Sequence, residues 1–168
     1  MFVGKHEVRL DSKNRVIVPQ RLRESGREGG QLCAEFYLTL GDEGCVAVYM
    51  PDAWNDVMGG IGATRPVPDA AMRMVQRLVA ANAVRLECDG AGRIVLPAEL
   101  RAYAGLKRDV LWIGCVNRAE IWDKDRWLEY QAKHVSQLGE KLDVVAQAGI
   151  MLPKGTEPAR KGPDVGRS

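Results

Sequence analysis

One ten-residue phrase occurs twice in the chain and constrains the fold more than any other feature. The first copy is residues 10–19 (LDSKNRVIVP), and the second is residues 88–97 (CDGAGRIVLP). Both read as an apolar residue, Asp, three turn-forming residues, Arg, three apolar residues and Pro, at a constant offset of 78 positions. The chain is therefore predicted to contain two copies of one small structural unit.

Each copy has the composition of a tight turn followed by a short strand. Residues 12–14 (Ser-Lys-Asn) and 90–92 (Gly-Ala-Gly) include the glycine and amide residues that accept positive φ at low cost. The apolar, β-branched run after each Arg favours a strand, and the following proline ends it. The phrase is therefore predicted to form a hairpin in each copy.

The charged residues of the two turns allow a structural and a functional interpretation. Asp11 and Asp89 precede Arg15 and Arg93 by four positions, so a salt bridge or an Asx-type hydrogen bond would clamp each turn. We assign the two aspartates this structural role. The cations Lys13, Arg15 and Arg93 differ, because a hairpin tip places them in solvent, where Arg can bind phosphate or guanine.

These residues resemble the MraZ family of bacterial transcriptional regulators, which are built from two tandem AbrB-like modules. The resemblance rests on the paired Asp–Arg phrases, on the start Met1–Gly4, and on a second echo of residues 48–54 (VYMPDAW) at 121–127 (IWDKDRW). It covers roughly residues 1–145. It implies an α+β fold in which two AbrB/MraZ-like swapped-hairpin β-barrel modules form one pseudo-symmetric unit with flanking helices.

The resemblance also implies a function. One face of each subunit would dock on double-stranded DNA, and subunits would form a homo-oligomeric ring, octamer-like by family resemblance. The target would be tandem boxes in the promoter of the cell-division and cell-wall gene cluster. Two departures are visible: Asn14 stands where glycine is common in the family, and Ala91 stands opposite Lys13, so the second tip lacks one cation. The candidate DNA-binding residues are Lys5, Arg9, Lys13, Asn14, Arg15 and Arg93.

The repeated unit spans only some 50 to 60 residues, which is marginal for an independent core. Two copies packed together bury more surface, so we expect them to form one unit. The expected boundaries are a first module over 1–58, a linker with a helix over 59–83, a second module with a long C-terminal helix over 84–147, and a basic, disordered tail over 148–168.

Local patterns predict the elements of each module. A short helix or turn is expected at 20–25, and strands are expected at 5–10, 16–18, 36–40, 45–49, 84–88, 93–97, 109–114 and 118–122. A helix capped by Asp52 should end at the glycine run 59–62. A second helix, from an Asp69 cap to about Asn82, carries an apolar stripe that we interpret as core: Met72, Val75, Leu78 and Val79.

The last helix is expected to run from about Lys124 to Gln147. Its apolar stripe is longer than one small module should need, which indicates packing against a second subunit. The candidate oligomer interface is therefore Trp127, Leu138 and Leu142. His134, on the same stripe, is interpreted as a core or interface residue rather than a metal ligand.

Charge is unevenly distributed along the chain. The formal net charge is +2, and the segment 153–168 alone accounts for it, so residues 1–152 are formally neutral. Residues 1–23 nevertheless carry a net charge of +4, whereas the equivalent stretch 85–101 is neutral. Any nucleic-acid site must therefore be a local patch, and copy one should contribute more of its charge.

Several classes of protein are disfavoured. The four cysteines lack CxxC spacing and the two histidines lie far apart, so neither a metal site nor a disulfide framework is indicated. Asp11 and Asp89 could be imagined as paired catalytic acids, but an Arg four residues after each would keep both ionised. With no Walker loop or dinucleotide fingerprint, we expect no enzyme, no cofactor and no small-molecule substrate.

The location of the protein is also predicted. No stretch approaches the ~20 apolar residues of a membrane span, and the first residues lack a signal-peptide segment. We expect a cytoplasmic, nucleoid-associated protein without membrane contact.

A second class of function stays open: a structural or protein-interaction module on the same fold, whose tips bind protein instead of DNA. Only DNA binding should weaken steeply with salt.

Overall fold

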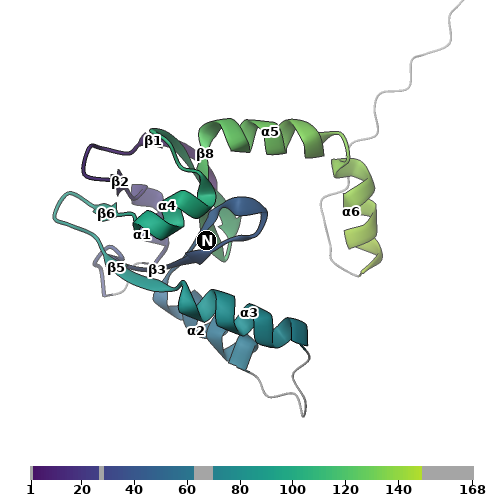
Figure 1. Cartoon of the computed structure of the whole chain (residues 1–168), viewed down its shortest axis with the longest axis horizontal. Helices are drawn as coiled ribbons and strands as arrows, with labels where there is room; N and C mark the ends of the chain where they lie inside the picture. The colour runs from purple at the N-terminus through teal and green to yellow at the C-terminus, as the bar shows by residue number, and fades with distance from the viewer. Residues whose placement is uncertain (1, 27–28, 63–69, 149–168) are drawn as a thin grey trace, which may run out of the picture. The chain divides into compact units, whose positions relative to one another are not determined.

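The computed structural model describes residues 2–26, 29–62 and 70–148 (Figure 1). The strands are β1 (Phe2–Arg9), β2 (Arg15–Ile17), β3 (Glu35–Leu40), β4 (Val46–Tyr49), β5 (Val84–Glu87), β6 (Arg93–Val95), β7 (Asp109–Val116) and β8 (Arg118–Asp123). The helices are α1 (Gln20–Ser25), α2 (Pro51–Gly62), α3 (Ala70–Ala81), α4 (Ala98–Ala104), α5 (Lys124–Val135) and α6 (Leu138–Gln147), with a 3-10 turn at Asp42–Gly44. The chain divides into two compact units, Met1–Glu129 and Tyr130–Ser168.

Six antiparallel strands form one sheet in the order β1-β7-β8-β4-β3-β5. The first strand of each copy pairs with the third strand of the other copy, as β1 with β7 and β5 with β3. The remaining strands, β2 and β6, pair with each other in a separate two-stranded ribbon. This exchange of strands confirms the predicted α+β fold of two tandem hairpin modules in one pseudo-symmetric unit.

The strand register marks a pseudo-two-fold axis. In the ribbon, Val16 lies opposite Ile94, and these residues are 78 positions apart. In the sheet, Ala47 lies opposite Glu120; each residue directly precedes one copy of the second echo, and the two are 73 positions apart. A residue faces its own repeat equivalent only on a two-fold axis, so the two copies are related by rotation at both places.

Both copies contribute equivalent side chains to the core. The ribbon and the short helix after it bury three aliphatic residues from each copy, and β3, β4, β7 and β8 bury the rest. Each such side chain contributes roughly 1.5–3 kcal/mol to folding when fully buried. The main members are Val16, Val18, Leu22, Ile94, Leu96, Leu100, Phe36, Leu38, Val46, Val48, Val110, Trp112 and Ile121.

The second echo in the sequence is a repeated aromatic contact. Trp54 of α2 stacks on Tyr37 at a ring-centroid distance of 5.4 Å and lies 5.8 Å from Tyr49. In the second copy, Trp127 of α5 packs edge-on against Trp122 at 5.4 Å. Each module thus fixes the helix after its last strand with one tryptophan.

The structure changes the predicted bounds of two helices. A helix at Ala98–Ala104, equivalent to α1, was not predicted; it ends at Gly105, whose φ of 60° lets its N–H reach the carbonyls of Arg101 and Ala102. The helix α2 ends at Gly62, within the expected run 59–62, but the run forms the last turn of the helix instead of beginning a loop. The Ile61 carbonyl there accepts a hydrogen bond from Gln76 of α3 (2.7 Å), so tertiary contact outweighs the low helix propensity of glycine.

The residue expected to cap α2 does not do so. Asp52 does not cap α2, because the helix already begins at Pro51 and Asp52 lies in its first turn. The other expected cap, Asp69, lies outside the described residues.

The apolar stripe of α3 is not core, as was predicted. Met72, Val75 and Leu78 are exposed, and only Val79 is half-buried. The contacts that attach α3 are polar: Thr39 donates to the Val79 carbonyl (2.9 Å), and Gln76 donates to the Ile61 carbonyl of α2 (2.7 Å).

The single last helix that was predicted is two helices. Gln137 donates its N–H to the His134 carbonyl (3.1 Å), three residues back, and the chain turns there before α6 begins. The break therefore lies at Ser136 and Gln137, between the end of α5 at Val135 and the start of α6 at Leu138. Within the described parts of the chain, no helix is long and apolar enough to cross a membrane.

Candidate nucleic-acid interface

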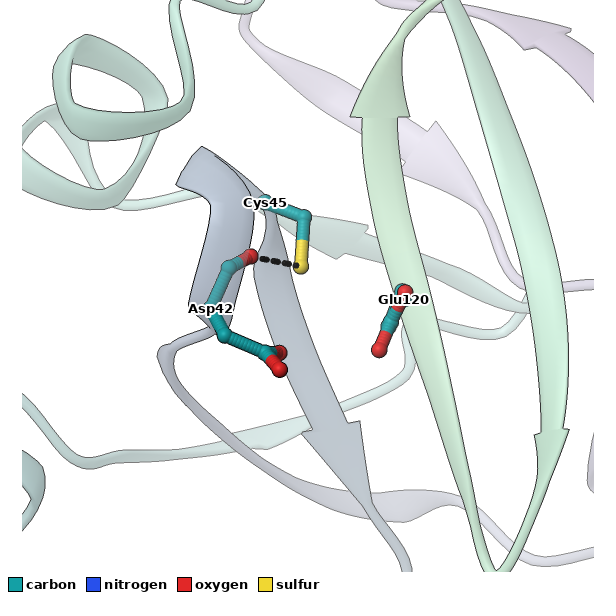
Figure 2. A group of neighbouring side chains, drawn as sticks. All are labelled: Asp42, Cys45 and Glu120. Carbon is teal, nitrogen blue, oxygen red and sulfur yellow. Dashed lines mark hydrogen bonds between the residues drawn. The ribbon is translucent and has the colours of Figure 1, made fainter. Parts of the chain in front are cut away.

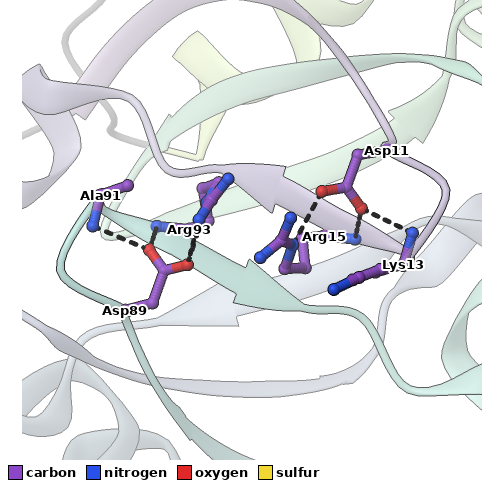
Figure 3. A network of polar contacts seen from close by, with 6 residues as sticks. All are labelled: Asp11, Lys13, Arg15, Asp89, Ala91 and Arg93. Atoms are coloured by element: carbon purple, nitrogen blue, oxygen red, sulfur yellow. Dashed lines mark hydrogen bonds and ion pairs between the residues drawn. The ribbon is translucent and has the colours of Figure 1, made fainter.

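The first turn is organised around one carboxylate (Figure 3). Asp11 Oδ1 accepts hydrogen bonds from the backbone N–H groups of Lys13 and Arg15, both at 2.9 Å. Asp11 Oδ2 accepts a charge-assisted bond from Arg15 Nε at 2.7 Å. The turn is closed by the Asp11 N–H, which donates to the Arg15 carbonyl (3.0 Å). One side chain therefore holds both the backbone of the turn and the guanidinium group at its end.

The second turn repeats these bonds atom for atom. Asp89 Oδ1 accepts from the N–H groups of Ala91 (3.0 Å) and Arg93 (2.9 Å), and Asp89 Oδ2 accepts from Arg93 Nε (2.9 Å). The backbone N–H of Asp89 donates to the Arg93 carbonyl at 2.8 Å. The local sequence Asp-x-x-x-Arg thus builds the same turn twice.

The turns differ at the residue that needs positive φ. Asn14 adopts φ 58° and its equivalent Gly92 adopts φ 75°. At Gly92 an added Cβ would lie 2.3 Å from Arg23 Nη1, so this turn has no room for a side chain unless Arg23 moves. Asn tolerates the left-handed region, which explains why the first turn can do without glycine.

The hydrogen bonds stabilise the ionised form of both aspartates. The pKa of Asp11 lies below its ordinary value, chiefly because the backbone N–H of Arg15 donates to the carboxylate. The pKa of Asp89 is lowered for the same reason by the N–H of Arg93, with the Arg93 side chain next in importance. Both carboxylates are therefore charged at neutral pH and keep their turns closed.

A substitution of Asp89 in the second turn tests whether this residue stabilises the fold or contacts a ligand. Asp89→Ala should lower the melting temperature at neutral pH, because three donors lose their acceptor, and should weaken any ligand binding only as a consequence. Since the folded pKa is depressed, the contribution of Asp89 is present above the ordinary carboxyl value of 3.8 and is lost as the pH falls through the folded value. The melting difference from wild type should therefore shrink in acid. Asp56→Ala, on the exposed side of α2, is the control; unchanged melting with lost binding would contradict the structural role.

The cations predicted for DNA binding fall into two groups. Lys13, Asn14 and Arg15 lie on the first turn, and β2 brings Arg15 beside β6, which carries Arg93 (Figure 3). Lys5 and Arg9 lie on β1 instead, and Arg9 pairs with Asp109 of β7 at 2.8 Å. The turns and the ribbon therefore form the candidate interface, with β1 as a neighbouring element.

Two residues of this surface were missed by sequence reasoning. Ile17 and Val95 are exposed on the ribbon, in the strands that also carry Arg15 and Arg93. Their β-branched character indicated a strand, but only the cross-strand register shows that they face outward. In the structure, burial alternates with period two within each three-residue strand, which places both residues outward.

A second polar cluster lies where the 3-10 turn Asp42–Gly44 and Cys45 approach β8, away from the two Asp–Arg turns (Figure 2). Oxygen or sulfur atoms of Asp42, Cys45 and Glu120 lie within 4.8 Å of one another, as metal ligands could. However, Arg118 donates to Glu120 (2.7 Å) and to Asp42 (3.3 Å), and Trp122 Nε1 donates to Glu120 (3.0 Å). Burial also raises the pKa of the Cys45 thiol, which disfavours the thiolate that a metal needs. We interpret the cluster as a structural ion-pair network.

The fold and the turns define a class of protein: duplicated swapped-hairpin modules whose two Asp–Arg turns lie at opposite ends of a shared ribbon and are related by a pseudo-two-fold axis. The family model described as "MraZ protein, putative antitoxin-like" matches residues 1–78 and again residues 79–143. The chain belongs to the MraZ family.

Related chains support this assignment over almost their whole length. The transcriptional regulator MraZ of Caldanaerobacter subterraneus is 38% identical over 146 residues, which cover 85% of this chain and 97% of the relative. The transcriptional regulator MraZ of Clostridium beijerinckii is 34% identical over 145 residues, with the same shares of the two chains. That of Acetivibrio thermocellus is 34% identical over 150 residues, which cover 89% of this chain and the whole relative.

Proposed function

We propose that this chain is a transcriptional regulator that binds double-stranded DNA through its two turns and the ribbon between them. The observation that carries the proposal is the bond from Asp11 or Asp89 to the Nε atom of the following Arg. This bond fixes the plane of the guanidinium group before any ligand arrives, so less side-chain entropy is lost on binding. The role is one of binding and needs no catalytic group.

We assign the paired arginines to base recognition and Lys13 to phosphate binding. Arg15 and Arg93 each have a carboxylate partner, so each pair is formally neutral and adds little net charge. Their directed donors suit the N7 and O6 acceptors of guanine, the commonest specific contact in the major groove. Lys13 is exposed, and the same turn holds it by its backbone, so its ammonium is suited to phosphate.

A single face of this kind should bind weakly, in the range of ~10⁻⁴–10⁻⁶ M that is typical of nonspecific contacts. We therefore propose that several subunits act together as a ring-like homo-oligomer, octamer-like as the family resemblance implies. Leu138 and Leu142 of α6 are exposed and would form the contact; Trp127 already packs against Trp122, so we assign it a lesser part. The target would be repeated promoter boxes of the cell-division and cell-wall gene cluster, which would make the protein nucleoid-associated.

The salt dependence of binding tests this proposal. The logarithm of the association constant for promoter DNA should fall linearly with the logarithm of salt concentration, because bound phosphates release counterions. Lys13→Ala should reduce the slope by about one per subunit engaged. The converse variant is Ala91→Lys. It adds a cation at the equivalent position of the second turn and should make the slope steeper by about one per subunit engaged.

The measurement is fluorescence anisotropy on a labelled duplex from the region upstream of the chain's own operon, at several salt concentrations. A slope that neither variant changes would remove the turns from the phosphate contact. Binding that hardly responds to salt would favour the alternative, a protein-interaction module on the same fold.

A further inference from the structure

The ribbon of β2 and β6 presents four side chains outward in a regular pattern. Arg15 lies opposite Val95, and Ile17 lies opposite Arg93. The residues between them, Val16 and Ile94, point inward and are buried. Since successive side chains of a strand alternate between its two faces, the four outward residues share one surface. Arginine and aliphatic residue therefore alternate both along each strand and across the pair.

The two aliphatic residues occupy equivalent places in the repeat. Ile17 is 41% exposed and Val95 is 55% exposed, and they are 78 positions apart, like Arg15 and Arg93. A single exposed aliphatic residue on a protein surface is ordinary. Here, however, both copies place one next to an arginine that a carboxylate anchors. The arrangement is thus a repeated unit of one directed donor and one apolar contact.

Ile17 is also positioned by the opposite turn. Its Cδ1 atom lies 3.8 Å from where a Cβ of Gly92 would be, so the side chain extends towards the second turn across the ribbon. The guanidinium group of Arg23 occupies the space next to Gly92, so a cation lies beside the isoleucine at this end of the ribbon. The apolar contact is placed opposite Arg93 on the neighbouring strand.

We propose that Ile17 and Val95 are specificity-determining residues that read thymine by contact with its C5 methyl group, beside guanines bound by Arg15 and Arg93. A two-stranded β-ribbon fits the major groove, and the methyl group of thymine is the apolar feature that the groove presents. The inference rests on the proposed DNA-binding function and adds that the ribbon between the turns, rather than the turn cations alone, reads sequence. Each recognised box should therefore combine guanine with neighbouring thymine.

Replacement of thymine by uracil tests this directly, because it removes only the methyl group. The full-length protein is first used to select its preferred duplex from a randomised pool. The selected duplex is then synthesised with thymine and with deoxyuridine at the thymine positions, one position at a time. Wild type should lose about three- to fivefold in affinity at each contacted position, the change that corresponds to ~0.8 kcal/mol for one buried carbon group.

The variants complete a double-mutant cycle. Ile17→Ala and Val95→Ala should bind the thymine duplex more weakly and should no longer distinguish it from the uracil duplex at their own positions. Val3→Ala is the matched control, since Val3 is 57% exposed on β1, outside the ribbon, and should keep full discrimination. Melting curves check that all three variants fold.

Two results would overturn the proposal. One is wild-type protein that binds thymine and uracil duplexes equally at all positions. The other is an effect of Ile17→Ala and Val95→Ala on the oligomer mass with unchanged DNA discrimination, which would assign the ribbon to a protein contact. Failure of the underlying function looks different, because a chain that does not bind DNA would enrich no duplex in the selection step.

Discussion

A chain that carries both Arg15→Ala and Arg93→Ala should melt close to the wild-type temperature and lose most of its specific DNA affinity. Each arginine that reads a base is expected to contribute ~1–3 kcal/mol, or roughly 5- to 150-fold in affinity. The fold should tolerate the change because both side chains are partly exposed and the aspartates keep their backbone partners.

The measurement compares melting curves with binding isotherms on the promoter duplex and on a scrambled duplex of equal length. Arg85→Ala is the control, because Arg85 on β5 also pairs with carboxylates, those of Glu35 and Glu87, but lies off the ribbon. The control should keep its specificity. Wild-type affinity in a folded double variant would exclude the arginines from recognition.

The second large effect is expected at α6. Leu138 and Leu142 are 53% and 37% exposed, so Leu138→Asp and Leu142→Asp together place charges on a surface rather than in a core. If this surface joins subunits, the variant should dissociate. The loss of linked faces should then cost about 10²–10⁴-fold in affinity for DNA with several boxes, while binding to one box stays as weak as before.

Light scattering gives the mass, and titration of duplexes with one, two or three boxes spaced by about one helical turn, ~10–10.5 bp, gives the valency. Gln147→Asp puts the same charge elsewhere on α6 and should leave the assembly intact. The proposal fails if the dissociated variant binds a single box as tightly as wild type binds three.

The features that sequence predicted well are local ones. The Asp–Arg phrase contains its own turn chemistry and the strand that follows, so both turns, and their duplication, are readable without tertiary information. The pairing was not predicted from the phrase alone, because β2 pairs with β6 of the other copy and not with the strand before its own turn. The tryptophan echo likewise marked the duplication, but Trp127 was assigned to a subunit interface, and its packing against Trp122 appears only in the structure. Candidate arginines could be named from residue type and turn position alone.

The features that sequence could not predict depend on what covers a surface. Met72, Val75 and Leu78 recur with the helical period that is typical of a buried helix face. That period does not show whether another element covers the face, and in the structure these side chains are exposed. Ile17 and Val95 were missed for the converse reason, since aliphatic residues in a strand suggest an interior. Their outward direction follows only from the pairing of β2 with β6.

The meeting of Ala47 with Glu120 on the pseudo-two-fold axis bears on how freely the two halves of the gene could be exchanged. Copy one has Cys45 and Ala47 at the places where copy two has Arg118 and Glu120, so one half supplies the space that the other half fills. A chain with two first halves would leave a void at the axis. A chain with two second halves would bury two facing carboxylates. We therefore expect that neither half can replace the other, although the two share one repeated sequence.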